Sequence, residues 1–134
     1  MSQIVLIIED DPDIAECLRL GLESAQLVAR VALTGEEGLA ASLDKNNPPA
    51  AILLDLLLPG MNGIEICRRL RQSEKKDIPI IVVSAKCSEG DRLASLAVGA
   101  DDYITKPFSV RDVVQRVSCL LQKSWDPQSQ VEST

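Results

Sequence analysis

The sequence predicts an α/β fold in which helices cover both faces of one parallel, doubly wound sheet. Short apolar runs alternate five times with amphipathic stretches of about 10–15 residues, the spacing of strand–helix units around a parallel sheet. The chain has 134 residues, of which 46% are hydrophobic and 25% charged. These values fit a single globular domain with a buried core and leave little room for a second domain.

Five apolar runs are the expected strands. They lie at residues 4–8, about 28–32, 51–54, 80–83 and 102–104. Only 2% of the residues are aromatic, so the core is expected to consist of Leu, Ile, Val and Ala. Runs this short, bounded by polar or turn residues, are typical of strands buried on both faces.

Helix start and stop signals follow each strand. Asp11 can cap a first helix that has Pro12 in its first turn, and Thr34 can cap a second. Gly99 is expected to stop the fourth helix. The first helix is expected to extend to about residue 22. The other expected helices are 35–43, 63–71, 91–98 and 110–121.

Together these elements predict a flavodoxin-like (βα)5 three-layer sandwich with parallel strand order 2-1-3-4-5. Residues 1–123 are expected to form this domain. Residues 124–134 are polar and are expected to be a tail or the start of a linker.

Composition excludes several classes of function. The formal net charge of −6 argues against direct contact with nucleic acid, which needs a basic surface. The longest apolar runs, 4–8 and 50–58, are too short to span a membrane, and no signal peptide precedes them. Four widely spaced cysteines are expected to be reduced, mostly buried thiols of a cytoplasmic protein.

The sequence contains no histidine. That absence excludes Ser-His and Cys-His catalytic pairs and a histidine-ligated zinc within this chain.

Three carboxylates are expected to meet at one edge of the sheet. Glu9 and Asp10 follow the first strand and Asp55 follows the third, and these strands are neighbours in the predicted order. Two such charges about 4 Å apart repel by roughly 4 kcal/mol at an effective dielectric of ~20. Mg²⁺ would offset this repulsion, because it binds a few carboxylates and shares its remaining positions with water and phosphate.

The fourth and fifth strands end in residues that suit phosphoryl transfer. Ser84 offers a hydroxyl and Lys106 a cation near Asp55. Taken singly, each has a simpler interpretation: an acidic cluster is often a solvated loop, a serine a strand end, and a lysine before proline a surface residue. Their appearance together at successive strand ends favours a site.

The sequence resembles response-regulator receiver domains over about residues 3–122. The likeness rests on IIEDD at 7–11, LDLLLPGMNG at 54–63, VVSA at 82–85 and KPF at 106–108. It implies that Asp55 accepts a phosphoryl group from a sensor histidine kinase or phosphotransfer protein, with Mg²⁺ as cofactor. The implied metal ligands are Glu9, directly or through water, Asp10, Asp55 and the backbone carbonyl of Leu57.

The resemblance also implies a switch. Ser84 and Lys106 would contact the phosphoryl oxygens, and a cis peptide would precede Pro107 and aim Lys106 into the site. Ser84 would move toward the phosphoryl group while Tyr103 turns inward, although an ordinary half-buried strand aromatic is the alternative. Residues 12–22 and those around Pro107 are expected to determine which kinase the domain recognises.

Residues 91–108 look most like the OmpR/PhoB subfamily. That likeness implies a homodimer through the fourth helix, fifth strand and fifth helix, with Arg92 facing Asp112 and Asp102 facing Arg116 across a two-fold axis. A solvated charged face is the alternative. Members of the subfamily normally continue into a DNA-binding winged helix, so an excised domain or a stand-alone regulator is expected.

Leu57 and Lys86 stand two residues beyond Asp55 and Ser84. Their bulk is expected to shield an acyl phosphate and slow self-dephosphorylation. Leu57 also occupies the place where a dehalogenase-like phosphatase needs a second aspartate, so a phosphatase is disfavoured. No nucleotide-binding glycine motif occurs. The presence of Asp10, Asp55, Ser84 and Lys106 together disfavours a degenerate binding module. The domain is not expected to be an enzyme with a free substrate.

Overall fold

The computed structural model describes residues 3–74 and 77–125, apart from the side chains of 123–125. Strands and helices alternate along the whole described chain. The strands are β1 (Ile4–Ile8), β2 (Val28–Ala32), β3 (Ala51–Leu54), β4 (Ile80–Ser84) and β5 (Asp102–Thr105). The helices are α1 (Pro12–Ser24), α2 (Gly35–Ser42), α3 (Gly63–Arg71), α4 (Glu89–Ala97) and α5 (Val110–Trp125).

All five strands pair in parallel in the order β2-β1-β3-β4-β5, which confirms the predicted order. Ile8 at the end of β1 lies in register with Leu54 at the end of β3. Ser84 at the end of β4 lies in register with Thr105 at the end of β5. The residues that follow these strands therefore come out along one edge of the sheet.

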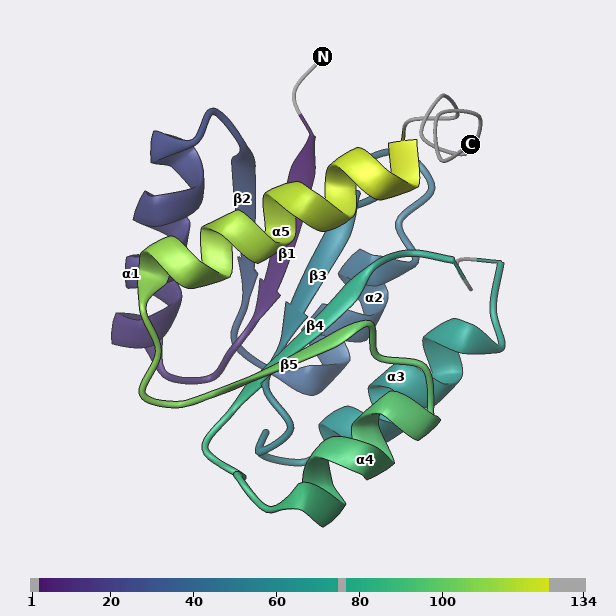
Figure 1. The fold of residues 1–134 in the computed structure, drawn as a ribbon. Coiled ribbons are helices and arrows are strands. Elements are labelled where there is room, and N and C mark those ends of the chain that lie inside the picture. Colours follow the sequence, from purple (N-terminus) through teal and green to yellow (C-terminus); the bar gives the residue numbers. More distant parts are fainter. Residues whose placement is uncertain (1–2, 75–76, 126–134) are drawn as a thin grey trace, which may run out of the picture.

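The helices form two layers, one on each face of the sheet (Figure 1). α1 and α5 cover one face, and α2, α3 and α4 cover the other. Because the sheet is buried on both sides, each strand supplies apolar side chains to two cores. The α1/α5 core contains Val5, Ile7, Leu53 and Ile81, and the opposite core contains Leu6, Ile8, Ile52 and Ile80.

Side-chain caps set the helix starts as predicted for α1 and α2. The Asp11 carboxylate accepts hydrogen bonds from the amides of Asp13 (2.9 Å) and Ile14 (3.3 Å). The Thr34 hydroxyl accepts from the Glu37 amide at 3.1 Å. α4 begins two residues earlier than predicted, because Ser88 caps it by accepting from the Asp91 amide at 3.0 Å.

The predicted limit of the domain falls within the last turn of α5. α5 continues to Trp125, past the predicted domain limit at residue 123. The sequence contains no helix breaker between Val110 and Pro127. The rest of the predicted tail, residues 126–134, lies outside the described residues.

The expectation of mostly buried cysteines is wrong. Cys67, on the inner side of α3, is buried, whereas Cys17, Cys87 and Cys119 are exposed. Cys17 and Cys119 lie on solvent-facing sides of helices, and Cys87 lies in the β4–α4 connection. Among the described residues, no helix is both long and apolar enough to cross a bilayer.

Candidate functional site

Three carboxylates converge where β1 and β3 end. Glu9 and Asp10 follow β1, Asp55 follows β3, and one oxygen from each lies within 4.8 Å of the others. The side chains of Glu9 and Asp55 are only 3% and 5% exposed, whereas Asp10 is exposed. The expected convergence is therefore present, with one carboxylate open to solvent and two enclosed.

Lys106 supplies the positive charge for the two enclosed carboxylates. Its Nζ lies 2.8 Å from Glu9 Oε1 and 2.9 Å from Asp55 Oδ2. The Lys106 backbone amide donates to the Ser84 carbonyl at 2.9 Å, which holds the end of β5 against the end of β4. The peptide bond between Lys106 and Pro107 is cis.

Burial and ion pairing shift the pKa values of Glu9 and Lys106. Burial raises the pKa of Glu9, assisted by the charge of Asp55 and opposed by hydrogen bonds from Lys106 and the Asp11 amide. Burial acts to lower the pKa of Lys106, but hydrogen bonds to Glu9 and Asp55 outweigh it and the net shift is upward. Lys106 therefore stays protonated and neutralises part of the acidic cluster.

Backbone contacts fix the orientation of Asp55. Its Oδ1 accepts a hydrogen bond from the Leu57 amide at 3.0 Å, while its own amide donates to the Ile8 carbonyl at 3.0 Å. A Cβ at Gly63 would lie 2.5 Å from the Asp55 carbonyl oxygen, so α3 starts directly against this loop. This role of Gly63 was not predicted, because its only signal in the sequence is a glycine eight residues after the aspartate.

Ser84 and Tyr103 meet at the backbone of Lys86. Ser84 is fully buried, and its Oγ accepts from the Lys86 amide at 3.3 Å. Tyr103 is 8% exposed, and its hydroxyl donates to the Lys86 carbonyl. Burial raises the pKa of Tyr103, so its hydroxyl remains a donor. The shared contact with Lys86 could not be seen in the sequence, because it joins two strands through a loop.

The donor set fits a hard divalent cation. Carboxylate oxygens gather at an edge where Asp10 is open to water, and Mg²⁺ favours oxygen ligands together with retained waters. Glu9, Asp10 and Asp55 are the residues that could hold such an ion. A lysine beside them leaves net negative charge for the ion to neutralise.

The predicted dimer-face residues form ion pairs within one protomer. Arg116 Nη1 lies 3.0 Å from Asp102 Oδ1, and Arg116 Nε lies 3.2 Å from Asp112 Oδ1. Arg92 pairs with Glu89 at 2.8 Å on α4. All four predicted residues lie on α4, β5 or α5, and their pairing between protomers stays a prediction.

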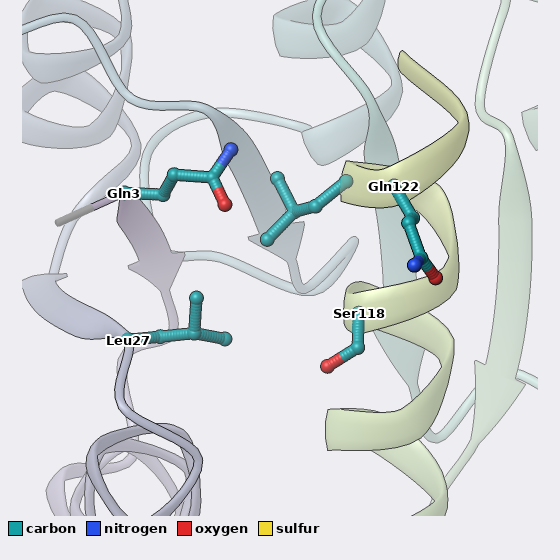
Figure 2. A pocket seen from close by; sticks show the side chains of 5 residues that line it. Gln3, Leu27, Ser118 and Gln122 are labelled. Carbon is teal, nitrogen blue, oxygen red and sulfur yellow. The ribbon is translucent and has the colours of Figure 1, made fainter. Parts of the chain in front are cut away.

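A separate hollow of about 200 Å³ lies at the opposite end of β1 (Figure 2). It is lined by Gln3, Leu27, Ser118, Leu121 and Gln122. Gln3 precedes β1 whereas Glu9 follows it, so the hollow is remote from the carboxylates. The candidate site is therefore an open edge of the sheet and not this hollow.

Fold and site together define a class of protein: a doubly wound α/β domain with a carboxylate cluster and a lysine at the carboxyl edge of its sheet. The family described as the response regulator receiver domain matches residues 5–118. The chain belongs to this family, which implies phosphorylation-dependent signalling in a two-component system.

Similar sequences are transcriptional regulators of the OmpR/PhoB type. The chain is 43% identical over 120 residues to the transcriptional regulatory protein ResD of Bacillus subtilis, covering 90% of this chain and 48% of ResD. It is 41% identical over 125 residues to the phosphate regulon regulator PhoB of Pseudomonas aeruginosa, covering 92% and 54%. The chain thus spans about half the length of these relatives.

Solved structures have the same fold. The receiver domain of the Francisella response regulator 1452 superposes with a TM-score of 0.84 at 32% identity, covering 92% of this chain and 99% of that one. DrrB, an OmpR/PhoB homologue from Thermotoga maritima, superposes with a TM-score of 0.82 at 27% identity, covering 92% and 54%. These matches agree with the predicted fold class and with the subfamily resemblance.

Proposed function

We propose that this domain is an Mg²⁺-dependent switch that accepts a phosphoryl group on Asp55 from a sensor histidine kinase or a phosphotransfer protein. The observation that carries the proposal is the hydrogen bonding of Lys106 to both Asp55 and Glu9, with the exposed Asp10 beside them. This arrangement combines an oriented carboxylate nucleophile with a cation that stays protonated.

The reaction would transfer the phosphoryl group without a change in redox state. A carboxylate oxygen of Asp55 attacks phosphorus, the P–N bond to the donor imidazole breaks, and an acyl phosphate forms on Asp55. Lys106 and the Ser84 hydroxyl would contact the phosphoryl oxygens. Glu9, Asp10, Asp55 and the Leu57 carbonyl would hold Mg²⁺, which when bound supplies charge neutralisation at those oxygens.

The output would pass through Ser84 and Tyr103. Both side chains bond to the Lys86 backbone, so a movement of the Ser84 hydroxyl toward a phosphoryl group removes one of these bonds. Tyr103 lies on β5 between α4 and α5. The α4-β5-α5 face would then change and control homodimerisation or an output partner.

A true phosphatase is the less supported alternative. Its chemistry requires an acid or base two residues after the nucleophile, and Leu57 is 51% exposed with an apolar side chain. The similar proteins are transcriptional regulators and not enzymes that turn over a free substrate. A switch that modifies only itself agrees with both observations.

Intact-mass spectrometry after incubation with Mg²⁺ and acetyl phosphate tests the proposal. We expect wild type to gain one phosphoryl group, to lose this capacity with EDTA, and Asp55→Asn to gain none. Gain of the same mass by Asp55→Asn would contradict the assignment of Asp55. If wild type gains nothing, beryllofluoride binding separates a receiver that needs its kinase from a degenerate binding module.

A further inference from the structure

The two ends of α4 are held very differently. Ser95 is the only α4 residue that is buried. Residues 85–90, which connect β4 to α4 and begin the helix, are all exposed. At the other end, Leu96 and Val98 pack against the core beneath α3, and the Val98 carbonyl accepts from Cys67 Sγ at 3.7 Å. The carboxyl end of α4 is therefore anchored and its amino end is open.

Arg71, the last residue of α3, makes most of this anchor. Its Nε and Nη2 donate to the Gly99 carbonyl at 2.9 and 2.7 Å, and its Nη1 donates to the Ile78 carbonyl at 2.7 Å. Its Nη2 also pairs with Asp101 Oδ2 at 3.0 Å. The same Asp101 oxygen accepts from the Ile80 amide at 2.8 Å. One guanidinium thus joins the ends of α3 and α4 to the starts of β4 and β5.

The Arg71 side chain is well placed for a fixed anchor. It is 19% exposed, and its bonds use the planar fork that gives arginine geometric specificity. Gly99 has a φ of +114°, and a Cβ there would lie 2.7 Å from Arg71 Cγ. Arg71 therefore lies directly across the turn between α4 and β5, and only a glycine fits beneath it.

The amino end of α4 is connected to the rest of the domain by fewer contacts. The Tyr103 hydroxyl donates to the Lys86 carbonyl just before the helix. The Ser88–Asp91 cap and the Lys86–Asp91 ion pair (3.7 Å) lie within the helix and its own connection, so they do not tie it to the sheet. The contacts of Ser84 and Tyr103 with the Lys86 backbone therefore both lie at this end of α4.

We propose that Arg71 is a positioning residue that pins the carboxyl end of α4, so that phosphorylation moves its amino end about this pivot. The inference rests on the proposed function, because the driving event is phosphorylation at Asp55. The pivot converts a loss of bonding at Lys86 into a tilt of α4 while residues 96–101 keep their place. In Figure 1 the carboxyl ends of α3 and α4 lie side by side, away from the β4–α4 connection.

Hydrogen exchange measured by mass spectrometry, with Mg²⁺ and with or without beryllofluoride, tests the pivot. In wild type we expect exchange at residues 85–91 to change by roughly tenfold and exchange at 96–101 by less than about twofold. In Arg71→Met we expect residues 96–101 to exchange roughly tenfold faster and to become sensitive to beryllofluoride. Arg69→Met is the matched control, because Arg69 is exposed and, within the described part of the chain, its side chain pairs with Glu65 of the same helix alone.

Several outcomes separate the pivot from a merely structural role. An equal response at both ends of α4 in wild type would overturn it. So would an Arg71→Met protein that is less stable but still confines its response to residues 85–91. Should Arg71→Met fail to fold, Asp101→Asn weakens the same anchor and must show the same spread. Wild type that neither gains phosphate nor responds to beryllofluoride would contradict the proposed function itself.

Discussion

Lys106 shows how one side chain can make a dense acidic cluster tolerable. It bonds to Glu9 and Asp55, the two enclosed carboxylates, and not to Asp10. A buried carboxylate without a partner would be costly, whereas an exposed one is stabilised by water. Asp10 therefore repels its neighbours without a compensating ion pair from Lys106.

This imbalance predicts that Asp10→Asn stabilises the protein in EDTA. Removal of one of three converging charges should raise the free energy of unfolding by ~1 kcal/mol, because Asp10 is exposed and the repulsion is partly screened. Excess Mg²⁺ should raise the melting temperature of wild type but not of Asp10→Asn. Thermal denaturation followed by circular dichroism measures both effects, and a lower melting temperature for Asp10→Asn in EDTA would contradict the argument.

Leu57 and Lys86 predict the lifetime of the phosphorylated state. Both side chains are exposed beside the site, where they can limit the approach of water to an acyl phosphate. A shield that adds ~1 kcal/mol to the hydrolysis barrier slows decay by roughly fivefold. Leu57→Ala and Lys86→Ala should each speed the loss of phosphate, measured by intact mass over time, whereas Leu20→Ala on α1 should not.

At the scale of elements, the crossing of α1 and α5 depends on one small residue. A Cβ at Gly21 would lie 2.3 Å from Val110 Cγ1 and 3.3 Å from Val114 Cγ2. The two helices therefore approach too closely for any side chain at this position. The apolar face of α5, with Val113 and Val117 buried, packs into the core that it shares with α1.

Gly21→Ala tests that crossing. Alanine favours a helix by about 1 kcal/mol over glycine, but overpacking costs about 1–3 kcal/mol, so a net loss of roughly 1 kcal/mol is expected. Gly90→Ala on α4 is the control, since a Cβ there meets only Ser88 Oγ at 3.8 Å. Urea unfolding should show a lower free energy of unfolding for Gly21→Ala and a higher one for Gly90→Ala. A higher free energy of unfolding for both variants would contradict the argument, because it would mean that α5 moves aside for the new side chain without cost.

At the scale of the whole molecule, the α4-β5-α5 face carries charges that are already paired. Arg116 links Asp102 on β5 to Asp112 on α5, and Arg92 pairs with Glu89. The Arg92–Glu89 pair is exposed and the Arg116 pairs are partly exposed, so each contributes little to stability and can exchange partners at small cost. A second protomer could therefore accept the same charges without breaking a strong bond.

A charge exchange tests dimerisation through this face. In a two-fold dimer an Arg92–Asp112 pair occurs twice. If each pair contributes ~0.7 kcal/mol, the loss of both raises the dissociation constant of the dimer by roughly tenfold. With Mg²⁺ and beryllofluoride, Arg92→Glu should weaken the dimer, and the added Asp112→Arg change should restore it. Sedimentation velocity measures the dissociation constant. A monomeric wild type under these conditions would contradict dimerisation and would favour binding of an output partner as the role of this face.

The strand order and the gathering of Glu9, Asp10 and Asp55 could be predicted from the sequence. Both depend on short-range patterns: five apolar runs, caps such as Asp11 and Thr34, and polar residues that directly follow strands. In a parallel sheet the carboxyl ends share one edge, so residues that follow neighbouring strands meet there even when they lie far apart in the chain.

Only the tertiary structure decided the rest. The Arg71 anchor, the shared contact at Lys86, the close crossing at Gly21 and the exposure of three cysteines all depend on which distant segments of the chain pack together. Local periodicity shows which side of a helix is apolar, but not which distant carbonyl its last arginine will meet. Such contacts are determined by packing, because they form only after the helices have packed on the sheet and fixed the distances between helix and strand ends.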